Sequence, residues 1–123
     1  MCDRGILFVV SGPSGVGKGT LCSLLLKQID NIFLSISLTS RPKRGKEKDG
    51  VDYYFTSAED FEEKIRKNEF LEWAKVYNNY YGTPKKIVEE KLDQGHDVLL
   101  EIDVQGAMKV KQNMPDGVFI FIM

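Results

Sequence analysis

Hydrophobic side chains gather in three continuous runs, at residues 6–10, 98–103 and 118–123, although the second run ends in acidic residues. Runs of this length without polar alternation are typical of strands that are buried on both faces of a parallel sheet. The runs are separated by longer segments in which apolar residues recur every three or four positions. We therefore predict three core strands joined through helices.

The spacing of apolar residues predicts four helices. The first is expected at residues 19–29 and the last at 104–113. The second is expected to begin at Ser57, which has Asp60 as its capping partner. The third is expected to begin at Thr83-Pro84, as N-cap and first helical residue, and to end at Gly95. Shorter strands are expected at residues 33–38, 51–55 and 70–76. The alternation of strand and helix predicts an α/β fold with a parallel sheet and helices on both faces. Residues 1–34 and 96–123 form its expected core, and 35–95 form a small mixed α/β insert with a connecting helix.

A glycine-rich segment lies between the first predicted strand and the first predicted helix, where it matches G-x-x-x-x-G-K and indicates a P-loop NTPase-type sheet. Glycines let backbone N–H groups approach phosphate oxygens, the helix presents its positive end, and Lys18 adds a charge. Gly19 replaces the usual Ser or Thr, and the resulting G-K-G-T form resembles that of nucleoside monophosphate kinases. The residues expected to bind ATP are Gly12, Pro13, Ser14, Gly15, Val16, Gly17, Lys18, Gly19 and Thr20. A glycine-rich turn without function is the alternative.

Two arginines, Arg41 and Arg44, lie three residues apart in a segment expected to be a loop. Both guanidinium groups can therefore converge on one phosphate, and Tyr53 and Tyr81 can add phenolic donors. In isolation these arginines would more often belong to a solvated basic turn. The neighbouring phosphate loop favours a second phosphate site.

Two acids, Glu101 and Asp103, close the second apolar strand, where a spacing of two residues places both on one face. They resemble a Walker B acid that reaches a metal or its waters. Together with Thr20 they are the candidate ligands of Mg²⁺ bound with ATP, directly or through water. Acids that merely cap the end of a strand are the alternative.

Residues 35–44 resemble the guanylate kinase signature S-x-S-x-T-x-R-x-x-R. The resemblance continues, in the family's order, through residues 49–55, 68–74, 79–84 and 100–106, so it covers essentially the whole chain. It implies an enzyme that transfers a phosphoryl group from ATP, with Mg²⁺, to GMP in the cytoplasm. By this resemblance Lys18, Arg41 and Arg44 are catalytic.

The resemblance also implies how GMP is bound. Its phosphate would be bound by Arg41, Arg44, Tyr53 and Tyr81, and its base by Glu72 with Ser37, Gly82, Thr83 and Asp103. Guanine presents N1–H and N2–H₂ as adjacent donors, which one carboxylate can accept together, whereas adenine has an acceptor at N1. Without the motif, Glu72 would more often be an exposed strand residue.

Composition adds limits to this picture. The 17 basic and 18 acidic residues give a net charge of -1, so the chain as a whole has no attraction to nucleic acid or to a membrane surface. The apolar runs are far shorter than the ~20 residues that span a bilayer. The cysteines, Cys2 and Cys22, are expected to be free thiols, and His96 is expected to be a solvated turn residue.

Two other functions remain open from the sequence. Adenylate kinases share the G-K-G-T loop, and guanylate-kinase-like modules of scaffold proteins keep the fold and bind peptides, although they lack the lysine that is Lys18 here. Guanylate kinases continue beyond the counterpart of Met123 with lid arginines, a further strand and an adenine-contacting segment. We therefore expect the 123-residue chain alone to have little kinase activity. We also expect it to self-associate through residues 118–122, at an unpaired sheet edge.

Overall fold

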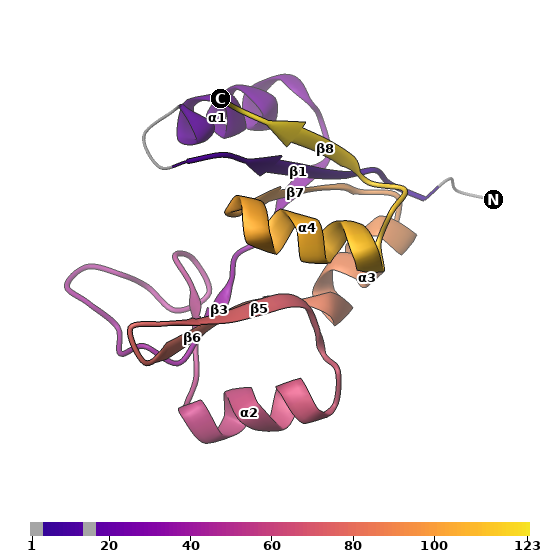
Figure 1. The fold of residues 1–123 in the computed structure, drawn as a ribbon. Helices are drawn as coiled ribbons and strands as arrows, with labels where there is room; N and C mark the ends of the chain where they lie inside the picture. Colours follow the sequence, from indigo (N-terminus) through magenta and orange to yellow (C-terminus); the bar gives the residue numbers. More distant parts are fainter. Residues whose placement is uncertain (1–3, 14–16) are drawn as a thin grey trace. The chain divides into compact units, whose positions relative to one another are not determined.

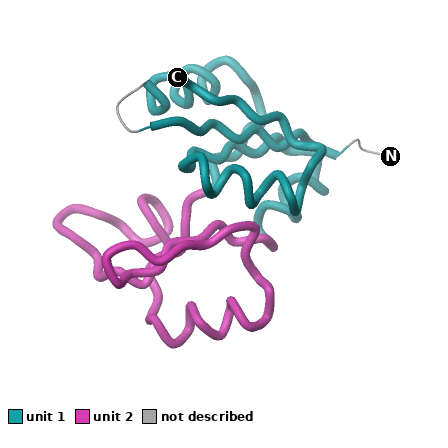
Figure 2. Tube along the Cα trace, in the orientation of Figure 1, with its two compact units in different colours: residues 1–35, 87–123 teal, residues 36–86 magenta. Residues whose placement is uncertain are grey.

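The computed structural model describes residues 4–13 and 17–123, whose helices and strands are labelled in Figure 1. The chain forms two compact units (Figure 2). Unit 1 contains the described residues up to Ser35 together with Ile87–Met123, and unit 2 contains Ile36–Lys86. From the sequence we expected residues 35–95 to form the insert together with its connecting helix. In the structure most of that helix, which follows Pro84, belongs to unit 1.

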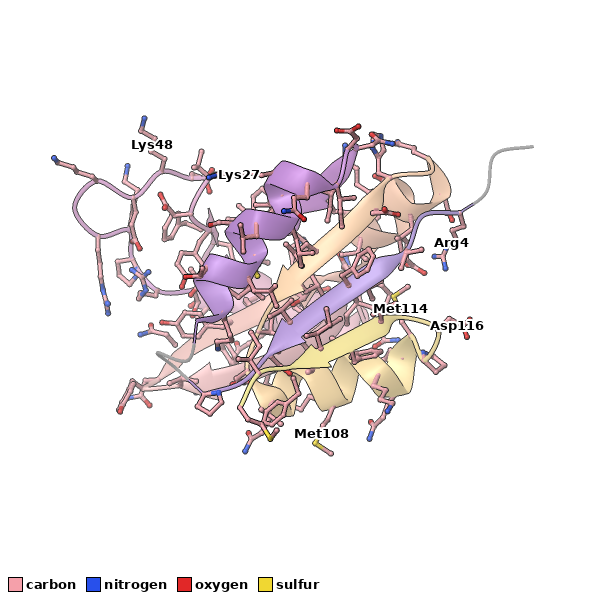
Figure 3. The ribbon with its side chains drawn as sticks, turned by 90° about the horizontal axis from the view of Figure 1, so that it is seen from above. Arg4, Lys27, Lys48, Met108, Met114 and Asp116 are labelled. Carbon is pink, nitrogen blue, oxygen red and sulfur yellow. The ribbon has the colours of Figure 1, made fainter. Side chains whose placement is uncertain are left out.

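Unit 1 is built on a four-stranded parallel sheet with the order β2-β7-β1-β8. Its strands are β1 (Leu7–Ser11), β2 (Ile32–Leu34), β7 (Asp97–Glu101) and β8 (Val118–Phe121). Its helices are α1 (Lys18–Gln28), α3 (Lys85–Asp93), which begins in unit 2, and α4 (Val104–Asn113). In Figures 1 and 3, α1 covers one face of the sheet and α4 the other. The predicted α/β class is therefore confirmed.

The core of unit 1 explains the continuous apolar runs. Val10 and Leu99 pack with Cys22 of α1 on one face, whereas their strand neighbours Val9 and Leu100 are equally buried. A strand in the middle of a sheet that is covered on both faces must be apolar at every position. The runs at 6–10 and 98–103 therefore form the core strands β1 and β7, as predicted, although β7 ends at Glu101, two residues before the end of its run.

The third apolar run forms strand β8, as predicted. Among the described residues, β8 pairs with β1 alone and lies at an edge of the sheet. Its first and last residues, Val118 and Phe121, are 42% and 53% exposed.

Unit 2 contains a mixed four-stranded sheet with the order β4-β3-β6-β5, and one helix. Its elements are β3 (Leu38–Thr39), β4 (Tyr54–Phe55), α2 (Ala58–Arg66), β5 (Phe70–Val76) and β6 (Asn79–Pro84). The ring of Phe61 on α2 stacks on those of Phe70 and Tyr80, at centroid distances of 4.4 and 4.9 Å. These stacked rings, together with Leu38, form the centre of the unit.

The start of α2 is the one predicted from the sequence. The Ser57 hydroxyl accepts a hydrogen bond from the backbone N–H of Asp60 at 3.1 Å, so Ser57 is the N-cap. Such a bond satisfies one of the amide groups that the first helical turn leaves without a partner. No helix among residues 4–13 and 17–123 combines the length and the apolar character needed to span a membrane.

Three other predictions were wrong in their boundaries. The strand expected at 33–38 divides into β2 and β3, which belong to different sheets. The strand expected at 51–55 shortens to two residues, because turns occupy residues 50–52. The helix expected from Thr83-Pro84 begins instead at Lys85, because both residues pair with β5 as the end of β6.

Strand β6 was not expected from the sequence. It forms a hairpin with β5 around Tyr77 and Asn78, whose φ angles are 49° and 67°. Two successive positive φ values are characteristic of the tight type I′ turn, in which asparagine is favoured. The hairpin brings residues 79–84 opposite 70–76 and thereby assembles one wall of the candidate site.

Candidate functional site

The segment predicted to be a phosphate loop lies between β1 and α1 of unit 1. Its central residues, Ser14, Gly15 and Val16, lie outside the described residues. Gly17 is the N-cap of α1 with φ 94°, a left-handed conformation that glycine adopts at little cost. Among the described residues no side chain caps this helix, and its first turn has no acidic residue, so its positive end suits an anionic ligand. The loop's flanks thus follow the predicted order of strand, glycine and helix.

The structure brings Glu101 next to the start of α1. A Cβ atom placed on Gly19 would lie 3.8 Å from the Glu101 carboxylate oxygen Oε1. Burial raises the pKa of the Cys22 thiol to about 11; the negative charge of Glu101 adds to this shift and the positive charge of Lys18 reduces it. Both charged groups therefore act on the same part of α1.

Asp103 has a capping contact, which is the kind of role that the sequence left open as the alternative to metal binding. Its oxygen Oδ1 accepts a hydrogen bond from the backbone N–H of Gly106 at 2.7 Å, which makes Asp103 the N-cap of α4. Because β7 ends at Glu101 and the chain then turns into α4, Glu101 and Asp103 do not share one face of a strand as predicted. Within residues 4–13 and 17–123, no three His, Cys, Asp or Glu side chains gather as metal ligands.

In unit 2 the structure gathers a positively charged aromatic cluster around Arg41. This side chain is only 5% exposed, although it follows β3 in a polar loop. Its Cζ atom lies 5.1 Å from the ring centroid of Tyr53 and 5.9 Å from that of Phe55. The edge of Tyr53 in turn meets Tyr81, at a centroid distance of 6.1 Å. Three of the four residues predicted to bind a phosphate are therefore neighbours.

Sequence reasoning missed Glu47, which the structure places at this cluster. Nη1 and Nη2 of Arg41 donate to its two carboxylate oxygens, each at 2.9 Å. The backbone N–H of Arg44 donates to Glu47 Oε1 at 2.8 Å, while the Arg44 side chain is exposed. The only signal for Glu47 in the sequence was an acid three residues after the second arginine of a basic loop.

These contacts shift the pKa values of both partners. The pKa of Arg41 is raised above its usual range, chiefly by the hydrogen bond to Glu47 and to a smaller extent by those to Tyr81 and Tyr53. The pKa of Glu47 is lowered to about 2, first by the hydrogen bond from Arg41 and then by that from the Arg44 backbone. Both groups are therefore ionised at neutral pH.

The predicted base contacts lie on the hairpin of β5 and β6. Glu72 pairs with Thr83 across the strands, and the Thr83 hydroxyl donates to Glu72 Oε2 at 2.9 Å. Leu38 pairs with Gly82 in antiparallel register, so Ser37 precedes β3 on the side of Thr83. The structure thus brings Glu72, Thr83 and Ser37 to one part of the sheet. Asp103 belongs to unit 1 instead.

Gly82 has a packing role in the same sheet. A Cβ atom at this position would lie 2.8 Å from the ring of Phe70 and 3.0 Å from that of Phe61. Any side chain would therefore displace the stacked rings that support β6. The structure thus gives Gly82 a reason to be glycine besides the ligand contact predicted from the sequence.

A cavity of about 260 Å³ lies at the other end of the unit 1 sheet, near the amino end of β1. Arg4, Met114 and Asp116 belong to its lining and are labelled in Figure 3. Of the residues predicted to bind ATP or GMP, none that the structure describes lines this cavity.

Comparison with known proteins gives consistent matches over almost the whole chain. Residues 4–123 match the family model described as guanylate kinase. The chain is 58% identical to the guanylate kinase of Clostridium perfringens strain 13 over 121 residues, which are 98% of this chain and 56% of that protein. It is 56% identical to that of Clostridium acetobutylicum over 123 residues, which are 100% of this chain and 58% of that protein.

A solved structure agrees with these sequence matches. The crystal structure of guanylate kinase from Anaplasma phagocytophilum superposes with a TM-score of 0.77 at 40% identity, covering 97% of this chain and 60% of that one. The chain therefore spans between 56% and 60% of the length of these three proteins.

Proposed function

This chain belongs to the guanylate kinase family, and from this premise we propose that it binds GMP through unit 2 and contributes to phosphoryl transfer from ATP, giving ADP and GDP. One observation carries the proposal. A pair suited to guanine, Glu72 with Thr83, and a cluster suited to phosphate, Arg41 with Tyr53 and Tyr81, lie in the same unit, on its sheet and on the loops that flank it.

The phosphate half of the proposal rests on the hydrogen-bond donors of Arg41. A guanidinium group has five N–H donors, and the bonds to Glu47 and to the Pro42 carbonyl account for three of them. The side chain also contacts the hydroxyls of Tyr81 and Tyr53, and a phosphate would take the place of these weaker contacts, with the two hydroxyls turning to its oxygens. Arg44 supplies a second guanidinium from an exposed position nearby. Charge-assisted bonds of this kind are the strong ones in phosphate recognition.

The base half rests on the orientation of Glu72. An ionised carboxylate accepts up to about four hydrogen bonds, so the bond from Thr83 fixes its direction while remaining compatible with two donors from guanine. Thr83 is itself 2% exposed and therefore well fixed. Adenine would place the lone pair of N1 against the carboxylate, and such a polar mismatch discriminates strongly.

The ATP half of the proposal assigns the triphosphate to the loop before α1. Lys18 and the N-terminal turn of α1, with Gly12, Pro13, Gly17, Gly19 and Thr20, would surround its phosphates. Mg²⁺ is usually held by one or two carboxylates together with waters and substrate phosphates, so the position of Glu101 beside α1 fits it without a larger cluster of acids. Thr20, Glu101 and the remaining oxygen of Asp103 would hold the ion, which when bound neutralises charge on the phosphates.

Transfer itself needs positioning and charge neutralisation more than acid–base chemistry. In this proposal Lys18 neutralises the donor phosphates, while Arg41 and Arg44 orient the acceptor phosphate. The family assignment disfavours an adenylate kinase, and the intact Lys18 favours an enzyme over a peptide-binding module. A cytoplasmic location is part of the proposal, since the buried Cys22 is a free thiol.

We expect the chain to bind GMP at least ~10-fold more tightly than AMP, because one lost polar contact corresponds to about 1.4 kcal/mol. Isothermal titration of GMP, AMP and ATP against the chain measures this directly. Guanosine and adenosine serve as controls that lack the phosphate and so isolate recognition of the base. Equal affinities for GMP and AMP would refute the guanine assignment.

We further propose that the 123-residue chain self-associates through β8. This strand lies at the edge of its sheet, and its exposed apolar residues can support pairing with a second copy. Sedimentation should show species larger than the monomer as concentration rises, and Phe121→Lys should shift the chain toward the monomer. A wild-type chain that stays monomeric at high concentration would contradict this prediction.

A further inference from the structure

We propose that Glu47 is the positioning residue of the acceptor-phosphate site, because it holds the guanidinium of Arg41 and the backbone of Arg44 in the arrangement that receives the GMP phosphate. The inference rests on the proposed function, since it concerns the site to which we assign that phosphate. Glu47 does not itself contact GMP; it acts through Arg41 and through the loop backbone at Arg44.

The geometry around Glu47 is that of a fixed connection between the two arginines. Its two oxygens accept from Nη1 and Nη2 of Arg41, each at 2.9 Å, so the planar guanidinium and the carboxylate are paired at two points. The oxygen that pairs with Nη1 also accepts the backbone N–H of Arg44 at 2.8 Å. One side chain therefore determines both the orientation of Arg41 and the path of the loop at Arg44.

Arg41 needs such a partner because of where it lies. Its side chain is 5% exposed and lies against the rings of Tyr53 and Phe55. A buried charge that loses its partner is strongly destabilised, and a long arginine side chain can escape this cost by turning toward solvent. Without Glu47, Arg41 would leave the position beside Tyr53 and Tyr81 in which it can meet a phosphate.

A second effect works in the opposite direction, because the Glu47 carboxylate repels the phosphate. Its side chain keeps 24% of its surface exposed, so water screens this repulsion. The carboxylate also forms a paired unit with Arg41 that leaves little net charge. We therefore expect that the loss of Arg41 positioning outweighs the relief of repulsion, and that removing the carboxylate weakens GMP binding.

The other acids of this loop have different contacts. Asp52 accepts the backbone N–H of Lys48 at 2.8 Å, and Asp49 accepts that of Phe55 at 2.9 Å. These bonds stabilise the loop backbone, whereas Glu47 bonds to the guanidinium of Arg41. A control variant is better placed outside the loop, at the exposed Glu63 of α2, which pairs with Arg66.

The test compares GMP with guanosine, which lacks the phosphate, in wild type, E47Q, E63Q, R41M and the E47Q/R41M double variant by isothermal titration. For E47Q we expect GMP to bind at least ~10-fold more weakly, as expected for loss of one charge-assisted arrangement, while guanosine affinity changes by less than about 2-fold. E63Q should leave both affinities unchanged. In the R41M background, E47Q should cause little further loss of GMP affinity, because the contact with Arg41 is already gone and glutamine keeps an oxygen that can accept the Arg44 backbone N–H.

Several outcomes would overturn the inference. They are unchanged GMP affinity in E47Q, an equal loss for GMP and guanosine, or additive losses in the double variant. If thermal unfolding shows that E47Q is not folded, E47D retains the charge with a shorter reach, and the inference requires it to weaken GMP binding selectively over guanosine. A wild-type chain that binds GMP no more tightly than guanosine would instead refute the proposed phosphate site itself.

Discussion

Replacing Phe61 with alanine is expected to lower the free energy of unfolding by about 3–5 kcal/mol, the usual cost of removing a buried aromatic side chain. Phe61 is 0% exposed, and its ring stacks on Phe70 and Tyr80, which belong to the two strands of the hairpin. The variant would leave a cavity under β6, the strand that supplies Tyr81 and Thr83 to the candidate site.

Fluorescence offers a direct measurement of this effect. Trp73 is the single tryptophan of the chain and lies in β5, with its ring 5.9 Å from that of Tyr80, so its emission reports on unit 2 during denaturation. Val51→Ala is a suitable control, because Val51 is 63% exposed and should change stability by no more than about 0.5 kcal/mol. A loss below about 1 kcal/mol in Phe61→Ala would contradict the packing described for this unit.

The second large effect is expected for Glu72→Gln, which should weaken GMP binding by about 30-fold and leave AMP binding almost unchanged. Hydrogen bonds to a charged group contribute about 1.5–3 kcal/mol each. Glutamine keeps one acceptor but places an NH₂ group against one of guanine's donors. The ratio of GMP to AMP affinity should therefore fall toward one.

The matched control for this variant is Glu69→Gln. Glu69 lies one residue before β5, and its exposed side chain forms an ion pair with Lys64 at 3.7 Å, so both nucleotide affinities should stay as in wild type. Circular dichroism checks that both variants are folded. If folded Glu72→Gln keeps the wild-type preference for GMP, Glu72 does not recognise the base.

Local patterns were enough to predict most elements of unit 1. The uninterrupted apolar residues of β1 and the helical spacing in α4 each depend on neighbours within a few residues. The same holds for the Ser57 cap of α2. Such features are determined by local propensity and by the side of the element that is buried, both of which are visible in a short segment of sequence.

The errors arose where pairing between distant segments decides the structure. The segment 33–38, Phe-Leu-Ser-Ile-Ser-Leu, reads as one half-buried strand, and nothing within it indicates that the chain leaves one sheet and enters another. Thr83 before Pro84 is a good start for a helix, but its hydroxyl bonds to Glu72 across a hairpin. Tertiary pairing of this kind overrides local propensity.

The candidate site shows the same division. A spacing of three residues suggested that Arg41 and Arg44 could share a phosphate, to which Tyr53 and Tyr81 could add donors, whereas the assignment of that phosphate to GMP came from the family resemblance. The structure brings Arg41, Tyr53 and Tyr81 together. Glu47 was missed because loops have no periodicity from which a partner can be inferred.

The account's central claim is that GMP binds to unit 2, and backbone amide shifts during a GMP titration test it most directly. We predict saturable shifts that are largest at Arg41, Arg44, Tyr81 and Thr83, whose amides belong to the phosphate cluster or to the strand that carries the base contacts. Shifts that are absent from unit 2, or confined to residues of the unit 1 cavity such as Arg4 and Asp116, would contradict the claim.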